Sequence, residues 1–207
     1  MKLTGDHVLH APVERVWDAL LDPAVLVQAI PGCSRLEATG ANAYDMTVTA
    51  GVAAIRGTYA GSCTLHDLAP HESLRMNLQG AGAPGTIGAD VAVSFAEAGD
   101  GTTRVTYAAD AVVGGMVGGV GQRMLTSVSR KMAGEFFGNV DVVLTGAAPV
   151  AAAVPVGGEM PVGQVFTPPA APVPPGWSRD DFLRGVAVGA GLVLAGVLAG
   201  ALGSRRR

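Results

Sequence analysis

Few side chains in this sequence could carry acid–base, nucleophilic or metal chemistry, and their spacing favours none of it. The four histidines are His7, His10, His66 and His71. His7 and His10 stand three residues apart in a predicted strand, so they point to opposite faces and cannot chelate one ion. No histidine, cysteine and carboxylate share the spacing of a metal site. The pattern predicts no metal centre, and structural or surface roles for the histidines.

The nucleophile and phosphate-loop patterns are also missing. Cys33 and Cys63 form no CxxC pair and no disulfide framework, so both are expected to be reduced packing residues. The glycine-rich run GGMVGGVG at 114–121 lacks the Lys-Ser/Thr of a phosphate loop, and we expect it to begin a helix. No Gly-x-Ser-x-Gly motif occurs. These absences predict a protein that is not an enzyme.

The inward-facing polar residues of the predicted strands are the remaining candidates for chemistry. Alternation over segments 44–49, 56–65, 73–78, 86–95 and 104–108 predicts antiparallel strands with one wet face. An enzyme built on such a sheet needs acids or bases on the inner face. The inner face is predicted to carry Tyr44, Tyr59, Tyr107, Cys63 and, from the first strand, His7. Buried tyrosines usually only satisfy their own hydroxyls, so packing roles are favoured.

Helices are predicted on both sides of these strands in the sequence. A strand over 2–10 leads to Pro12, which suits the first turn of a helix. A second short helix is expected near 24–30, and EAGDGT at 97–102 is a hairpin turn. From about 115 to 144 the period becomes helical, which predicts one long helix that packs on the sheet through an apolar stripe of Val117, Val120, Met124, Val128, Met132 and Phe136. The fold class is therefore α+β, with residues 1–146 as one domain.

Small residues on the predicted inner face leave room for a guest. Gly57, Gly61, Ala89 and Ala109 lie there, Gly121 faces them from the predicted helix, and aromatic residues are only 5% of the chain. A dry apolar cavity normally holds an apolar molecule, and methionines make an adaptable lining. A tightly packed core is the alternative. The candidate ligand-binding residues are Met46, Val48, Tyr59, Met76, Val91, Val93, Tyr107, Val117, Val120, Gly121, Met124 and Val128.

Three segments resemble a known family. APVERVWDALLD, with Pro12, Val16 and Trp17, is similar to the start of the START-like helix-grip (SRPBCC) superfamily. AIPGCSRLE, IRGTYAGSCTL and GQRMLTSVSRKMAGEFFGNV, in that order, resemble the carbon monoxide dehydrogenase G-subunit family. The resemblance covers about residues 1–145. It implies a curved antiparallel sheet around a long C-terminal helix, an apolar cavity between them, and association with a molybdenum-type CO dehydrogenase. The family brings no catalytic motif.

Segment 147–207 differs in composition from the domain. Segment 147–176 holds eight of the thirteen prolines, which predicts an extended linker that reaches at most about 90 Å. Segment 177–207 contains an uncharged run, Gly185–Gly203, whose helical length of about 28 Å matches a bilayer core. A C-terminal membrane anchor is predicted, with a glycine stripe that allows tail-mediated self-association. The candidate membrane residues are Trp177, Gly185, Gly189, Gly196 and Gly200.

Two observations bear on this anchor. If the domain is cytosolic, the terminal Arg205–Arg207 of a spanning helix would lie outside, against the positive-inside tendency. The tail also lacks a polar face, so it is a poor interfacial helix. Spanning or deep insertion is the favoured interpretation, and a helix packed on a partner protein is the alternative.

The charge balance and the N-terminal residues bear on the protein's location and on its partners. Residues 1–146 carry 9 basic and 14 acidic side chains, an acidic balance that excludes a nucleic-acid partner. Lys2 is followed by polar Thr4, Asp6 and His7 rather than by an apolar signal-peptide core. The expected location is the cytoplasmic face of the cell membrane.

These features suggest three functions. The first is a non-catalytic accessory protein of CO dehydrogenase that holds a lipid-like guest, expected to be menaquinone or another isoprenoid quinone, and links the enzyme to the membrane respiratory chain. The second is a passive recruitment scaffold with an empty cavity. The third is a cyclase-like enzyme of the same fold.

Overall fold

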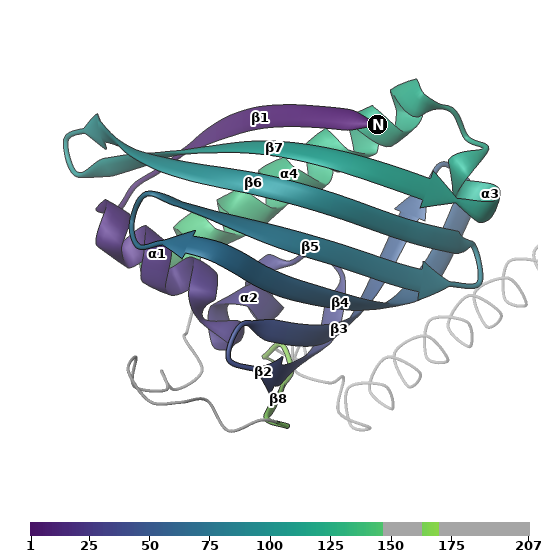
Figure 1. Ribbon diagram of the computed structural model, residues 1–207, viewed down its shortest axis with the longest axis horizontal. Helices are drawn as coiled ribbons and strands as arrows, with labels where there is room; N and C mark the ends of the chain where they lie inside the picture. The colour runs from purple at the N-terminus through teal and green to yellow at the C-terminus, as the bar shows by residue number, and fades with distance from the viewer. Residues whose placement is uncertain (147–162, 170–207) are drawn as a thin grey trace, which may run out of the picture. The chain divides into compact units, whose positions relative to one another are not determined.

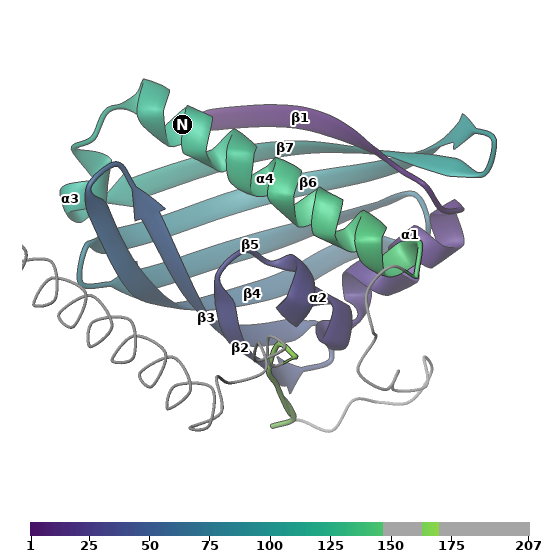
Figure 2. The ribbon, with the colours of Figure 1, turned by 180° about the vertical axis from the view of Figure 1, so that it is seen from behind.

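The computed structural model describes residues 1–146 and 163–169, which form a curved antiparallel sheet with helices on its inner side (Figures 1 and 2). The eight strands lie in the order β1-β7-β6-β5-β4-β3-β2-β8. The elements are β1 (Lys2–Leu9), α1 (Val13–Leu21), α2 (Pro23–Ala29), β2 (Cys33–Gly40), β3 (Ala43–Val52), β4 (Ile55–Ala69), β5 (Ser73–Gly82), β6 (Gly85–Gly99), β7 (Thr102–Gly114), α3 (Gly115–Gly118), α4 (Gln122–Leu144) and β8 (Val165–Phe166). This confirms the α+β helix-grip architecture.

Alternation along the strands builds the inner face. In β4, Tyr59, Cys63 and Leu65 are buried, while the residues between them are exposed or only partly buried. Cys63 lies opposite Leu78 of β5, so inward residues of neighbouring strands stack side by side. The predicted hairpin turn joins β6 to β7, where Asp100 and Gly101 both have positive φ.

The N-terminal helices close one end of the sheet. Pro12 occupies the N-cap position of α1 without a side-chain hydrogen bond, whereas Asp22 caps α2 by accepting a hydrogen bond from the Ala24 amide at 2.8 Å. On α1, Val16 and Trp17 are buried, and the Trp17 ring meets Phe95 edge-on with 5.5 Å between centroids. Both predicted helices are confirmed within a residue or two.

The predicted single helix over 115–144 is wrong, because the structure has two. The four-residue α3 ends at Gly118, and α4 begins only at Gln122. Gly121 between them has a φ of +91°, a conformation that an α-helix does not contain. The helix α4 then crosses the inner side of the sheet diagonally (Figure 2), with Phe137 and Val140 buried beneath it.

Two strands, β2 and β8, were not predicted from the sequence. In β2 the register with β3 shifts between Cys33 and Arg35, and this irregularity breaks the alternation that marks a strand. The strand β8 lies inside the segment predicted as a linker. Its pairing extends to Gln164, whose carbonyl accepts from the Ala38 amide at 3.1 Å, and Phe166 stands opposite Leu36.

The predicted anchor, with Trp177, Gly185, Gly189, Gly196 and Gly200, lies outside the described residues, as does most of 147–176. The chain divides into two units, Met1–Pro169 and Ala170–Arg207, and the description above concerns the first. Among the helices of residues 1–146, none combines the length and apolar character needed to cross a membrane.

Candidate ligand-binding cavity

An apolar cavity of about 280 Å³ lies between the sheet and the helices α1, α2 and α4. Helices α1 and α2, with the residue that follows α2, contribute three aliphatic side chains, and α4 contributes two phenylalanines. Strands β2 to β6 supply the rest. The lining residues are Leu20, Leu26, Ile30, Leu36, Tyr44, Met46, Cys63, Leu65, Leu74, Met76, Leu78, Val93, Phe95, Phe136 and Phe137.

The cavity is packed more tightly toward α1 than in the opposite direction. Leu65, Leu74 and Phe95 are buried where Trp17 covers the sheet. Met46 and Leu78, which lie farther from α1, are only partly buried. We call the side at α1 and α2 the closed end, and the side toward α3 and the first turns of α4 the open end.

The ionisable groups in the cavity wall are Tyr44 and Cys63, and burial keeps both neutral. Burial raises the pKa of the Cys63 thiol to about 11. The pKa of Tyr44 is raised mainly by burial and further by Cys63 and Asp22 nearby, and its hydroxyl donates to the Leu21 carbonyl at 3.4 Å. At neutral pH the wall offers neither a thiolate nor a carboxylate. This lining suits the binding of an apolar molecule.

The predicted ligand-binding residues fall into three groups. Met46, Met76 and Val93 line the cavity. Val48, Tyr59, Val91 and Tyr107 lie on the inner face outside the cavity, where both tyrosines are buried and both valines partly buried. Val117, Val120, Gly121, Met124 and Val128 belong to the region around the helix break, and none of them lines the cavity.

The third group lies away from the cavity because the break between α3 and α4 interrupts the helix, so apolar residues before and after it do not share one face. Val117 is buried on α3, but Gly121 is exposed, and Met124 on α4 is 44% exposed. Spacings of three and four residues place side chains on one face only within a continuous helix. The stripe predicted across 117–128 therefore does not form a single surface.

The sequence interpretation missed most of the wall. Leu20, Leu26 and Ile30 were expected as parts of two short helices, without a role in the cavity. Their common apolar face could have been found, because α1 is strongly amphipathic. Phe136 belonged to the predicted stripe and does reach the cavity.

The histidines take part in local contacts. His10 pairs with Asp141 of α4 at 2.7 Å, and the His7 ring stacks on Phe137 with 4.7 Å between centroids. Within residues 1–146 and 163–169, no three His, Cys, Asp or Glu side chains gather as a metal ion would require.

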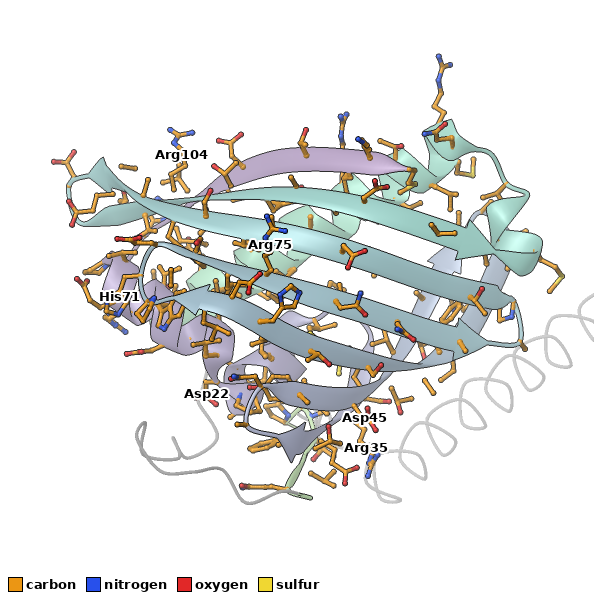
Figure 3. The ribbon with its side chains drawn as sticks, viewed as in Figure 1. Asp22, Arg35, Asp45, His71, Arg75 and Arg104 are labelled. Atoms are coloured by element: carbon orange, nitrogen blue, oxygen red, sulfur yellow. The ribbon has the colours of Figure 1, made fainter. Side chains whose placement is uncertain are left out.

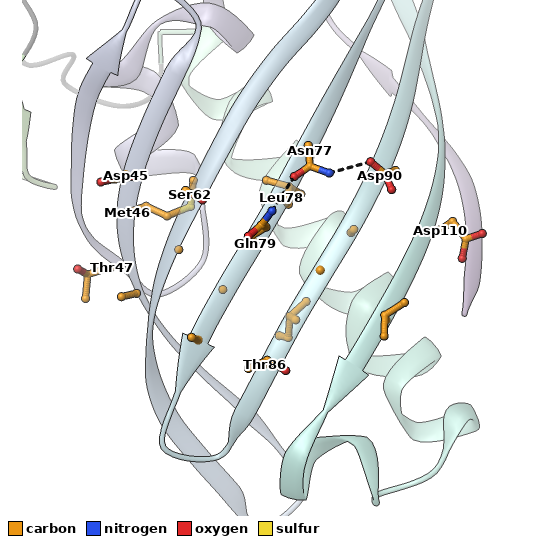
Figure 4. Close-up of a pocket in the computed structure, with 18 of the residues that line it drawn as sticks. Asp45, Met46, Thr47, Ser62, Asn77, Leu78, Gln79, Thr86, Asp90 and Asp110 are labelled. Carbon is orange, nitrogen blue, oxygen red and sulfur yellow. Dashed lines mark hydrogen bonds between the residues drawn. The ribbon is translucent and has the colours of Figure 1, made fainter.

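A larger hollow of about 790 Å³ lies on the outer face of the sheet (Figure 4), and its lining is mainly polar or small. There Asn77 donates to Asp90 at 2.8 Å, and Asp45 and Asp110 stand at its margins. Arg75 and Arg104 also stand on this outer face (Figure 3). This lining is unsuited to an apolar guest, so the inner cavity is the candidate site.

The family model for the G subunit of carbon monoxide dehydrogenase (CoxG) matches residues 5–145, more than half of the chain. The chain belongs to the CoxG family. None of the curated proteins compared with the chain matches it.

Several solved structures are similar to this chain. A conserved protein from Geobacillus kaustophilus is 31% identical, with a TM-score of 0.68, over 71% of this chain and 97% of its own. A START superfamily protein from Mycobacterium smegmatis is 12% identical, with a TM-score of 0.56, over 71% of this chain and 99% of its own. The Zhui aromatase/cyclase from a Streptomyces species is 14% identical, with a TM-score of 0.55, over 74% and 99%. The last two share the fold alone. Membership of the CoxG family and the START-like fold together support a ligand-binding accessory role.

Proposed function

We propose that this CoxG-family protein is a non-catalytic carrier that holds an isoprenoid quinone in its apolar cavity and links a molybdenum-type CO dehydrogenase to the membrane respiratory chain. The observation that carries the proposal is the cavity itself. It measures about 280 Å³, its wall is almost wholly aliphatic and aromatic, and it sits inside an otherwise well-packed domain.

The chemistry of the cavity favours a carrier over a catalyst. General acid–base work needs a group whose pKa lies near the working pH. The ionisable groups of this wall, Tyr44 and Cys63, both have raised pKa values. The cyclase-like alternative would need an acid or a base that these positions do not supply.

The membrane link rests on the sequence of the tail. The uncharged Gly185–Gly203 run is long enough to cross a bilayer core, and the proline-rich segment gives the domain reach. We place the protein at the cytoplasmic face of the membrane. A quinone is confined to the bilayer, so a tethered apolar cavity provides a route for it to an enzyme outside the bilayer.

Fractionation tests the anchor. Full-length protein should sediment with membranes and remain there in high salt, because hydrophobic burial is not screened. A chain that ends after Pro169 keeps β8 and should be soluble. Release of the full-length protein by salt alone would refute the anchor.

Electron delivery tests the carrier role against the passive scaffold. Met46 lines the cavity, so the side chain introduced by Met46→Trp should occupy the space of the guest. Thr64 lies on the exposed face of the same sheet, so Thr64→Trp should leave the cavity available to the guest. In membranes that contain CO dehydrogenase, the carrier role predicts that CO-dependent quinone reduction falls with Met46→Trp and persists with Thr64→Trp. A scaffold predicts unchanged reduction in both variants as long as each still fractionates with membranes.

A further inference from the structure

The closed end of the cavity offers a polar guest no strong free donor. Tyr44 and Cys63 carry the polar hydrogens of the wall. The Tyr44 hydroxyl already donates to the Leu21 carbonyl at 3.4 Å, and a thiol is a weak donor. A quinone carbonyl buried here would lose its hydrogen bonds to water without replacement, which weakens binding by roughly tenfold or more.

A free donor lies toward the open end. Along the inner face of β4 the order from the closed end is Leu65, Cys63, Gly61 and Tyr59, and only the first two line the cavity. Tyr59 is 8% exposed, and its hydroxyl makes no hydrogen bond to any of the described residues. Among those residues, no fully enclosed side-chain oxygen or nitrogen lacks a partner. The Tyr59 ring is therefore buried while its hydroxyl reaches accessible space.

The size of the cavity requires part of the guest to lie outside it. Its 280 Å³ is just below the range of about 300–1,000 Å³ that is usual for pockets enclosing a drug-sized ligand. A quinone with a long isoprenoid chain is larger than such a ligand. Past Met46, the inner face continues over Val48, which is partly exposed, lies outside the cavity wall and stands opposite Tyr59. This surface leads toward Tyr59.

We propose that the guest binds chain-first, so that part of its isoprenoid chain fills the cavity while the quinone head stays toward the open end and accepts a hydrogen bond from the Tyr59 hydroxyl. The inference rests on the proposed function and deepens it by assigning each half of the guest to a region of the inner face. The head then remains within reach of an electron donor without leaving the protein.

Binding of three probes to the full-length protein in lipid nanodiscs tests the orientation. Menadione is a head without a chain, farnesene is a chain without a head, and a short-chain menaquinone has both. Farnesene and the menaquinone should bind at the cavity and menadione much more weakly, because each buried methylene strengthens binding by roughly fourfold. Binding at the cavity is the part of the total probe binding that is lost in Met46→Trp and kept in Thr64→Trp. If Met46→Trp fails to fold, Leu78→Phe replaces it.

Tyr59→Phe separates the two halves of the guest. It should weaken binding of the menaquinone by roughly two- to tenfold, the range expected for one hydrogen bond, and leave farnesene binding unchanged. A merely structural tyrosine would change both equally or neither. Either of those results would overturn the Tyr59 contact.

Reduction by dithionite reports where the head lies. Dithionite supplies two electrons and water supplies two protons, so the quinone becomes a quinol. A head at the open end should be reduced nearly as fast as free menaquinone. If the bound quinone is protected and menadione binds as tightly as the menaquinone, the head lies inside and the orientation is wrong, although the carrier role stands. If neither the menaquinone nor farnesene binds at the cavity, the carrier role itself fails and the inference with it.

Discussion

The two ends of the inner face differ in how completely the chain fills them. At the closed end, Leu9, Val16, Leu36, Val105 and Val140 are almost fully buried. At the open end the chain is rich in glycine, and several large apolar residues remain exposed. They are Ile87, Met116 and Met124. The difference indicates that the closed end provides most of the stability, whereas the open end leaves room for a guest to enter.

Truncation of one side chain at each end should give the largest contrast. Leu9→Ala removes a side chain that is 1% exposed and should lower the free energy of unfolding by about 2–5 kcal/mol. Met124→Ala, at an exposed position of α4, should change it by no more than about 0.5 kcal/mol. Denaturant unfolding measures both. Equal losses would mean that the two ends contribute alike.

Added bulk should be tolerated in the cavity and resisted at the helix break. A Cβ at Gly121 meets no atom within 4 Å, yet its φ of +91° strains any other residue. We therefore expect Gly121→Trp to cost about 1–3 kcal/mol through the backbone. Met46→Trp should cost less, because it fills empty space. A larger loss of unfolding free energy for Met46→Trp than for Gly121→Trp would show that the cavity has no room for the added side chain.

The free energy of unfolding should fall measurably at alkaline pH because the Cys63 thiol is buried. Burial raises the pKa of Cys63 from 9.0 to about 11, so in this interval the native state holds a proton that the unfolded chain has lost. The stabilising contribution is complete below pH 9 and falls as pH rises, by at most about 1.4 kcal/mol per pH unit. Unfolding of wild type and Cys63→Ala across pH 8 to about 11 should show the shallower slope in the variant. Parallel slopes would place the thiol in water.

A modest effect is expected at the edge of the sheet, where β8 pairs with β2. Phe166 packs on the core opposite Leu36, but β8 has only two residues. Phe166→Ala should lower the unfolding free energy by about 1 kcal/mol and speed hydrogen exchange at the Ala38 amide, which donates to Gln164. A chain that ends after Ala147 should show the same fast exchange. Unchanged exchange in both proteins would contradict a stable β8 pairing in solution.

The sequence predicted the regular strands and the first two helices better than the helix break, β2 and β8, for physical reasons. Residues alternate regularly along β3 to β7, and this pattern reports burial directly, so the sheet could be predicted. The first helix could be predicted from the helical spacing of Val13, Val16 and Trp17. The break at Gly121 could not, because glycine within an apolar stripe is compatible with a continuous helix until backbone geometry is known. The bulge in β2 and the long-range pairing of β8 are tertiary effects, which local periodicity does not encode.

In the candidate site, the division runs between strand residues and helix residues. Met46, Met76 and Val93 were predicted because they alternate inward on regular strands. Leu20, Leu26 and Ile30 were missed because their approach to the sheet depends on how α1 and α2 fold back over it. A list of inward residues from strands and one helix therefore described only part of the wall.

Native mass spectrometry of the full-length protein, released from membranes of its own cells, tests the central claim most directly. Wild type and Thr64→Trp should each carry one isoprenoid quinone per chain, and Met46→Trp, folded and still membrane-associated, should carry none. Wild-type protein without any bound quinone, or a quinone that persists in a folded Met46→Trp variant, would contradict the claim that the inner cavity holds it.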